Sequence, residues 1–106
     1  MKKIKNKDIK LQDILKELLK METIVEKSIS DTIKVIMKNN EYLCKEIISR
    51  DNIINESKHK LEKDAVYLLS KKELEDMKFR ELIAILKIIT DLDRISDHCT
   101  DISKNI

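Results

Sequence analysis

The 106-residue sequence contains no glycine, no proline and no tryptophan, and its aromatic residues are two tyrosines and one phenylalanine. Sandwiches, barrels and α/β sheets of this length need several tight turns, and tight turns depend on glycine and proline. Phosphate-binding loops and nucleophile elbows also require glycines, so motifs of these kinds are excluded. Hydrophobic residues, mainly isoleucine and leucine, make up 42% of the chain and charged residues 40%. This composition predicts one all-α domain spanning residues 1–106.

Charge and cysteine content limit the partners and the cellular compartment that can be expected. Basic residues number 22 and acidic residues 20, with the two signs interspersed and little arginine, so no nucleic-acid partner is expected. The basic run at residues 1–7 is followed by no apolar stretch, so we do not expect it to act as a secretory signal. No apolar run is long enough to span a membrane, which allows at most peripheral membrane contact. Two cysteines without CxxC spacing favour a reducing compartment, and we therefore expect a cytoplasmic protein.

Apolar residues recur at helical spacing in three long segments, at about residues 8–38, 41–70 and 76–104. In the first segment this spacing is followed by Leu11, Leu15, Leu18, Val25, Ile29 and Ile36. Asn39 and Asn40 separate the first two segments, because asparagine tolerates left-handed geometry and can close a helix without glycine. Cys44 and Cys99 fall on apolar stripes and are expected to be small core groups. Two short connections make neighbours antiparallel, which predicts an up-down-up three-helix bundle of long helices.

Acidic residues interrupt the expected pattern in the third segment, where aspartates occur at positions 91, 93, 97 and 101. Asp93, Asp97 and Asp101 are spaced i, i+4 and i+8, so three like charges would line one helix face and repel one another. Either solvent and nearby basic residues or a bound cation must offset this repulsion. The first interpretation makes the aspartates a solvated acidic edge beside Lys87 and Arg94.

The second interpretation is a carboxylate metal site. In the second segment Asp51 and Asn55 are also spaced i, i+4, and facing helices of a bundle can present such oxygen ligands to one ion. The candidate ligands are therefore Asp93, Asp97, Asp51 and Asn55. Oxygen ligands favour magnesium, manganese or iron, and zinc is tolerated. A catalytic triad needs converging loops, which this chain nearly lacks, so we expect no enzyme.

Residues 86–97, Leu-Lys-Ile-Ile-Thr-Asp-Leu-Asp-Arg-Ile-Ser-Asp, resemble the third-helix signature of the PhoU family of phosphate-uptake regulators, which typically reads Leu-Glu-Arg-Ile-Gly-Asp. Asp93 stands where the family has glutamate, the next two residues match, Ser96 replaces glycine, and Asp97 matches. Arg80 lies at the position of a family arginine, and residues 50–55, Arg-Asp-Asn-Ile-Ile-Asn, resemble the family's second-helix segment. The resemblance extends over about residues 8–106.

This resemblance implies a bundle of three long helices, with multinuclear iron or zinc clusters on Glu/Asp-x-x-x-Asp motifs of its surface. By residue correspondence the motif carries over to Asp93 and Asp97, and to Asp51 and Asn55, whereas Lys58 stands where the family often has glutamate. The implied partners are the ATPase of a phosphate ABC transporter and a membrane sensor histidine kinase. Members of the family usually hold two bundles in tandem, so either two copies of this chain associate as a homodimer or the chain is half of a longer protein.

The expected function is therefore non-enzymatic regulation of phosphate uptake or phosphate signalling through protein contacts, with a carboxylate metal site as a further element. One alternative is the cytosolic PhoU-like domain of a sodium/phosphate cotransporter. Another is a metal-free helical oligomerisation module. A di-metal phosphatase is the remaining alternative, and it lacks a general base beyond the ligands themselves.

Overall fold

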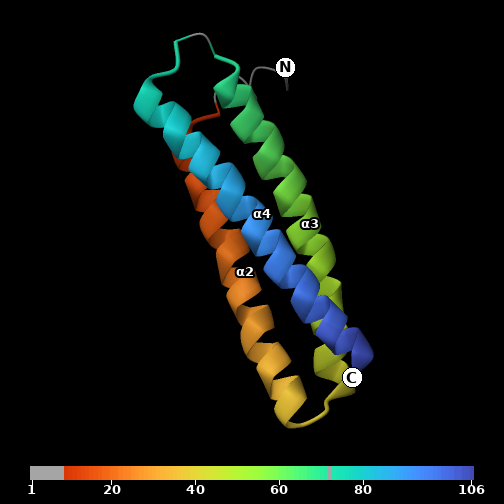
Figure 1. Ribbon diagram of the computed structural model, residues 1–106. Coiled ribbons are helices and arrows are strands. Elements are labelled where there is room, and N and C mark those ends of the chain that lie inside the picture. The colour runs from red at the N-terminus through yellow and green to blue at the C-terminus, as the bar shows by residue number, and fades with distance from the viewer. Residues whose placement is uncertain (1–8, 72) are drawn as a thin grey trace, which may run out of the picture.

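The computed structural model describes residues 9–71 and 73–106, and nearly all of them belong to three helices (Figure 1). The helices are α2 (Leu11–Met37), α3 (Glu41–Leu69) and α4 (Asp76–Asn105), and the described residues form no strand. The all-α fold expected from the sequence is thus confirmed. The second and third helices end within a residue of the expected positions. The first begins at Leu11, and the start predicted at residue 8 lies outside the described residues.

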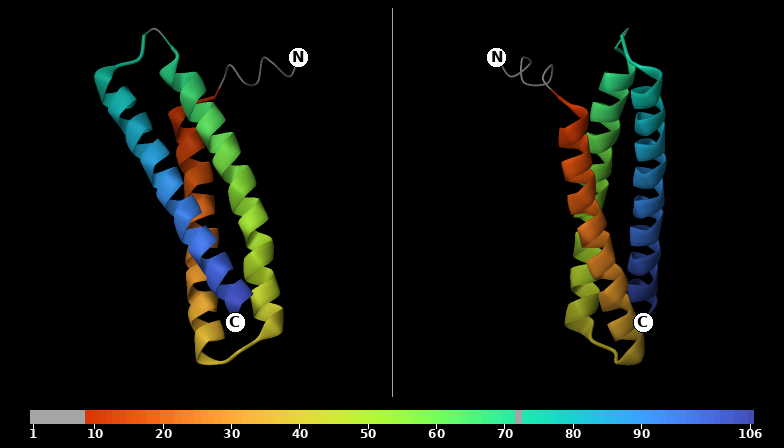
Figure 2. Two further views of the ribbon diagram at one scale, coloured as in Figure 1. Left: turned by 45° about the vertical axis from the view of Figure 1, so that its right-hand side comes forward. Right: turned by 90° about the vertical axis from the view of Figure 1, so that its left-hand side faces the viewer.

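The three helices form an elongated bundle with up-down-up topology. α2 and α4 run in the same direction and α3 runs against both (Figures 1 and 2). The bundle measures 53 × 31 × 17 Å, and each helix packs on both others, with the α2–α4 pair packed least extensively. Each helix must therefore bury a stripe against two neighbours and leaves its remaining surface to solvent.

Helix α3 begins and ends without glycine because neighbouring residues pair with its terminal amides and carbonyls. The side chain of Asn40 accepts a hydrogen bond from the backbone N–H of Leu43 at 3.1 Å, which makes Asn40 the N-cap of α3. At the other end of α3 the backbone N–H of Ser70 donates to the Val66 carbonyl. Asn40 is extended, with φ −144°, and no described residue has a positive φ. The left-handed asparagine expected between the first two helices is therefore not formed, since the residue serves to start α3.

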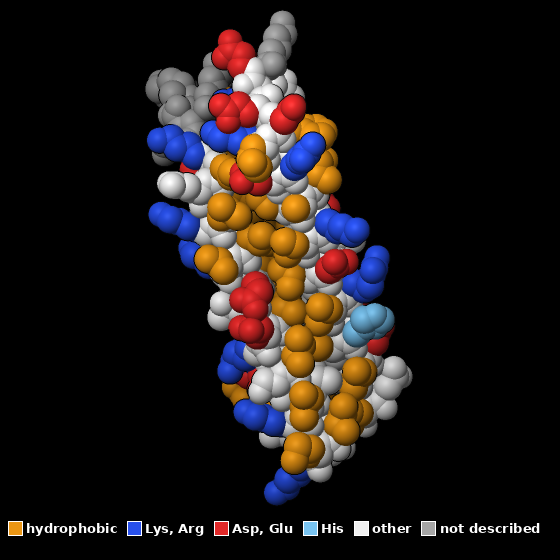
Figure 3. Space-filling model, turned by 60° about the vertical axis from the view of Figure 1, so that its left-hand side comes forward, with side chains coloured by type: hydrophobic (Ala, Val, Ile, Leu, Met, Phe, Trp, Pro, Cys, Tyr) orange, Lys and Arg blue, Asp and Glu red, His pale blue; other side chains and the backbone are white. Residues whose placement is uncertain are grey.

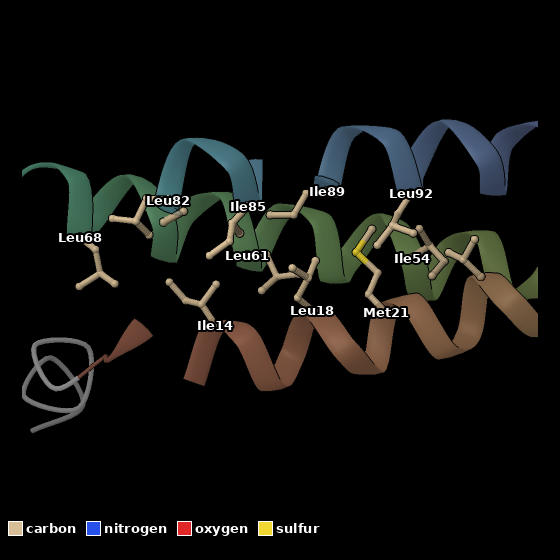
Figure 4. Packing of buried hydrophobic residues seen from close by; sticks show 12 residues of the cluster. Ile14, Leu18, Met21, Ile54, Leu61, Leu68, Leu82, Ile85, Ile89 and Leu92 are labelled. Carbon is tan, nitrogen blue, oxygen red and sulfur yellow. The ribbon is translucent and has the colours of Figure 1, made fainter. Parts of the chain in front are cut away.

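The larger apolar core fills the half of the bundle nearest the connection between α3 and α4. Side chains from all three helices point toward one another there (Figure 4). They include Ile14, Leu18 and Met21 of α2, Ile54, Leu61 and Leu68 of α3, and Leu82, Ile85, Ile89 and Leu92 of α4. The cluster consists of aliphatic side chains and one methionine, and none of the buried residues that the structure describes is aromatic.

The other half of the core is much more polar. A small apolar cluster there consists of Val35, Cys44, Ile47 and Cys99, and both cysteines are free and buried, as the sequence predicted. The buried polar residues all lie on α2 and α4, namely Ser28, Asp31, Thr32, Ser96, Thr100 and Ser103. Burial of polar groups costs free energy unless they are paired, so this half needs specific partners where the first half needs only packing.

The buried stripe of α2 differs in part from the one read along the sequence. Leu18 and Val25 are buried as that stripe requires. Leu15, Ile29 and Ile36 follow the same helical spacing but are exposed on the adjacent face. The core stripe instead continues through small polar side chains, which an apolar pattern passes over.

Candidate functional site

Arg50 of α3 makes a buried ionic contact with α2. Its Nη2 lies 2.8 Å from Asp31 Oδ2 and 3.4 Å from Glu46 Oε1, and Nη1 donates to Ser28 Oγ at 3.5 Å. The Asp31 side chain is only 5% exposed and that of Arg50 12%. The short contact between Arg50 and Asp31 is an ion pair without an aligned hydrogen bond, because Asp31 Oδ2 has no hydrogen-bond donor among the described residues. Two charges this deep are stable only together.

Asp51, the next residue along α3, points to α4. Its Oδ1 accepts a hydrogen bond from Ser96 Oγ at 3.0 Å, and Ser96 itself is buried. Consecutive residues of α3 therefore bind the two other helices, Arg50 to α2 and Asp51 to α4. Because successive helical residues point about 100° apart, adjacent positions on one helix can reach two neighbours.

One turn beyond Ile54, the side chain of Lys58 reaches across to α4. Its Nζ lies 3.3 Å from Asp93 Oδ2, and both side chains are partly buried. The hydrogen bond to Asp93 and the charge of Asp93 raise the pKa of Lys58 against the opposing effect of burial. Asp97 and Glu62 add weaker attraction to the same ammonium group. Lys58 is thus held in its charged form.

Asp97 is the least compensated carboxylate of the group. Partial burial of its carboxyl is the largest cause that raises the pKa of Asp97, and the negative charges of Asp93 and Asp51 raise it further. A hydrogen bond from the protonated Asp97 to Asp51 acts in the same direction, and Asp101 contributes the smallest repulsion. We call the group formed by Asp51, Lys58, Asp93, Ser96 and Asp97 the α3–α4 acidic seam.

The acidic seam contains three of the four predicted metal ligands. Asp51, Asp93 and Asp97 lie along one contact between α3 and α4, whereas Asn55 is exposed and none of the described hydrogen bonds involves its side chain. Across residues 9–71 and 73–106, no three His, Cys, Asp or Glu side chains are grouped so that they could hold a metal ion. The ammonium of Lys58 contacts Asp93, so a cation could bind at the seam only by displacing it.

The sequence reading missed the Arg50–Asp31 pair and the hydroxyl partner of Asp51. A usable signal existed for the first of these. On α2, the polar residues Ser28 and Thr32 continue the helical stripe that contains Val25. On α3, Asp51 and Lys58 likewise occupy positions of the apolar stripe. Polar residues at corresponding depths of two helices indicate a buried polar contact, but the pattern alone does not identify which residues pair.

The chain matches the PhoU domain over residues 18–106 and therefore belongs to the PhoU domain family. No solved structure matches it. None of the helices in the described part of the chain combines the length and apolar character that a membrane span requires.

Several curated proteins are similar to the chain, all named phosphate-specific transport system accessory protein PhoU homolog. The Clostridium acetobutylicum protein is 33% identical over 99 residues, which is 91% of this chain and 44% of that protein. The Borreliella burgdorferi protein is 33% identical over 103 residues, 95% of this chain and 46% of its own length. The Pseudomonas putida protein is 27% identical over 94 residues, which is 89% of this chain and 37% of that protein. The chain thus spans less than half the length of these relatives.

Proposed function

We propose that the chain is a regulatory domain of phosphate uptake that acts through protein contacts and catalyses no reaction of its own. The observation that carries the proposal is the family match across residues 18–106, together with relatives named as accessory proteins of phosphate-specific transport. The proposed partners are the ATPase of a phosphate ABC transporter and a sensor histidine kinase, met in the cytoplasm. Two buried free thiols are consistent with that compartment.

The long, nearly parallel helices support a contact mechanism. An elongated bundle of 53 Å presents rigid helix faces on which a partner can dock without remodelling the core. The polar half of the core joins all three helices through Arg50 and Asp51, so a partner that shifts one helix would disturb both contacts. Binding at the surface can in this way be linked to the relative positions of the helices.

The experiment is co-purification combined with phosphate uptake. Tagged chain is captured from cells of its source, and the transporter ATPase and sensor kinase are identified in the eluate. Phosphate accumulation is compared in cells with and without the gene and after its return on a plasmid. Capture of either partner with a restored uptake phenotype supports the proposal. Unchanged phosphate accumulation without either partner would contradict it and leave a helical oligomerisation module.

A carboxylate cation site is a second proposal, favoured by the repulsion of Asp97 by Asp93 and Asp51. A cation would have to displace the Lys58 ammonium, because Lys58 already neutralises Asp93. Thermal unfolding is therefore measured with magnesium, manganese, zinc and ferrous iron for the parent and for Lys58→Met. Metal that binds only the native state raises the melting temperature with the logarithm of its concentration. The rise should be larger in Lys58→Met and absent after Asp97→Asn in that background. No shift in either protein at millimolar metal would retire the site.

A further inference from the structure

A groove lies at the end of the bundle where α3 connects to α4. It is lined by the start of α2, the end of α3, the connection and the first two turns of α4, and its volume is about 910 Å³. Figures 1 and 2 show these segments together at one end of the molecule. Ligand-binding clefts commonly measure about 300–1,000 Å³, so this end groove has room for a small molecule.

The floor of the end groove is continuous with the larger apolar core. Leu68 and Leu82 line the groove, belong to that core and are 8% and 1% exposed. Figure 4 shows both side chains at one end of the labelled cluster. Ile9, Leu11 and Leu74 also line the groove, and these half-buried side chains pack against the same core. An aliphatic chain in the groove would extend the core and be removed from water.

Lysines from three different parts of the chain border the end groove. Lys10 precedes α2, Lys71 follows α3, and Lys78 lies in the first turn of α4. The Nζ of Lys71 lies 5.3 Å from the centroid of the Tyr67 ring, which holds this side chain at the end of α3. Among residues 9–71 and 73–106, none of the ion pairs involves these three lysines. Their ammonium groups can therefore bind the carboxylate of a ligand.

The charges around the end groove favour an anion over a cation. Glu73 and Glu75 also border it, so three positive side chains stand against two negative ones. No side chain caps the first backbone N–H groups of α4, and the N-terminus of a helix attracts negative charge. Asp76 in that first turn offsets part of this attraction, which leaves the lysines as the main source of positive charge.

We propose that the end groove binds a single-chain anionic amphiphile, namely a long-chain carboxylate. Its aliphatic chain lies on Leu68, Leu74 and Leu82, and its carboxylate meets Lys71 and Lys78. An uncharged apolar molecule would make no use of the lysines, and a small inorganic anion would leave the leucines exposed. The groove shares no residue with the acidic seam, so this proposal does not depend on the regulatory role proposed above.

The test is equilibrium binding of saturated carboxylates of eight to twelve carbons, each kept below its micelle concentration. Binding is measured as displacement of fluorescent dansylaminoundecanoic acid from the purified chain. Affinity should rise by about fourfold with each added methylene, because each methylene buried in the groove leaves water. Decanol should bind about tenfold more weakly than decanoate, because it lacks the charge. Acetate and inorganic phosphate should not displace the probe.

Two sets of variants separate the roles of the lysines and the leucines. Lys71→Gln with Lys78→Gln should weaken binding of decanoate by about tenfold and leave binding of decanol unchanged. Leu74→Gln should weaken binding of both ligands by about tenfold, because it places a polar group against the aliphatic chain. Circular dichroism checks that the variants remain helical.

The competing surface for an amphiphile is the exposed apolar side of the bundle. Figure 3 shows hydrophobic side chains gathered in an almost continuous band along one side of the molecule. Ile33 of α2 is 52% exposed and lies outside the groove, so Ile33→Gln is the matched control for Leu74→Gln. It should leave both affinities unchanged. Equal weakening by Ile33→Gln and Leu74→Gln would assign binding to the exposed surface and overturn the proposal.

A vesicle experiment distinguishes a free carboxylate from a lipid surface. The chain is sedimented with vesicles of phosphatidylcholine and phosphatidylglycerol, and the same lysine variants are compared. Displacement of the probe by dodecanoate in solution, without sedimentation of the chain, supports the proposal. No displacement by dodecanoate at 100 µM would overturn it. Lysine-dependent sedimentation without such displacement would also overturn it and assign the lysines to a membrane surface.

Discussion

Arg50 Nη2 and Asp31 Oδ2 lie 2.8 Å apart in the interior of the bundle, with the two side chains 12% and 5% exposed. They join α3 to α2 at the level where Asp51 joins α3 to α4 through Ser96. A buried ion pair stabilises the fold little more than apolar residues of similar size would. Removal of one partner alone is strongly destabilising, because it leaves the other charge buried without a counter-charge. The main effect of the pair is to define which residues of α2 and α3 lie opposite one another.

Removal of Asp31 should therefore destabilise the bundle strongly. Asp31→Ala leaves Arg50 buried without its partner, and we expect a loss of about 3 kcal/mol in the free energy of unfolding by urea. The contact of Arg50 with the more exposed Glu46 limits the loss. Asp91→Ala, which breaks the exposed pair with Arg94, is the control and should change stability by less than about 0.5 kcal/mol.

A double-mutant cycle distinguishes pairing from simple loss of packing. If the two charges interact, Asp31→Ala combined with Arg50→Ala should cost clearly less than the sum of the single substitutions. Strict additivity of the two losses would show that the ion pair carries no coupling energy.

Asp93→Asn and Asp97→Asn should have opposite effects, although both residues belong to one i, i+4 pair. Asp97→Asn removes repulsion with Asp93 and Asp51 and should stabilise by a few tenths of a kcal/mol at pH 7. Asp93→Asn leaves Lys58 without its closest counter-charge and should destabilise. Urea unfolding of both variants at low ionic strength measures the difference, and equal effects of the same sign would contradict the pairing of Lys58 with Asp93.

The gain from Asp97→Asn should depend on pH with a definite sign. Because the native pKa of Asp97 is raised above its ordinary value of 3.8, the folded state binds the proton more tightly than the unfolded state. The ionised Asp97 carboxylate therefore lowers the free energy of unfolding at pH values above the native pKa. This loss disappears as the pH falls through the native pKa toward 3.8. The advantage of Asp97→Asn should shrink over the same range. Carboxyl carbon NMR titration locates the transition, and a gain that stays constant down to pH 3.8 would contradict the raised pKa.

The hydroxyl of Thr100 is buried, and no described group bonds to it. Thr100→Val keeps the side-chain shape and removes the desolvated hydroxyl, so it should raise the free energy of unfolding by about 1 kcal/mol. The control is Thr90→Val, because the exposed Thr90 hydroxyl donates to the Leu86 carbonyl at 3.1 Å. That substitution should be nearly neutral. A loss of stability in Thr100→Val would show that a bound water satisfies the hydroxyl.

Asn40 is the N-cap of α3 and begins this helix in a chain that has no glycine. Asn40→Ala removes the acceptor of the Leu43 backbone N–H and should cost about 1 kcal/mol, measured by thermal unfolding. Asn40→Asp keeps an acceptor and adds a favourable charge at the helix N-terminus, so it should restore parent stability. Equal losses in both variants would mean that the cap contributes through another group.

The helices themselves could be predicted from the sequence because their cause is local. Periodic apolar residues and the absence of glycine and proline leave helix as the favoured conformation along most of the chain, and asparagine and serine mark the breaks. Two short connections then allow few arrangements besides the up-down-up bundle. The acidic cluster of α4 was also visible, because it depends only on spacing within one helix.

Contacts between helices were decided by the tertiary structure. The i, i+4, i+8 spacing implied repulsion among Asp93, Asp97 and Asp101, but Lys58 of another helix neutralises the first and leaves the second with a raised pKa. Spacing likewise could not separate buried Leu18 from exposed Leu15, because both follow an apolar helical stripe and only the neighbouring helices determine which stripe is covered. Charge pairing and burial depend on distances across the bundle, and one-dimensional spacing does not contain those distances.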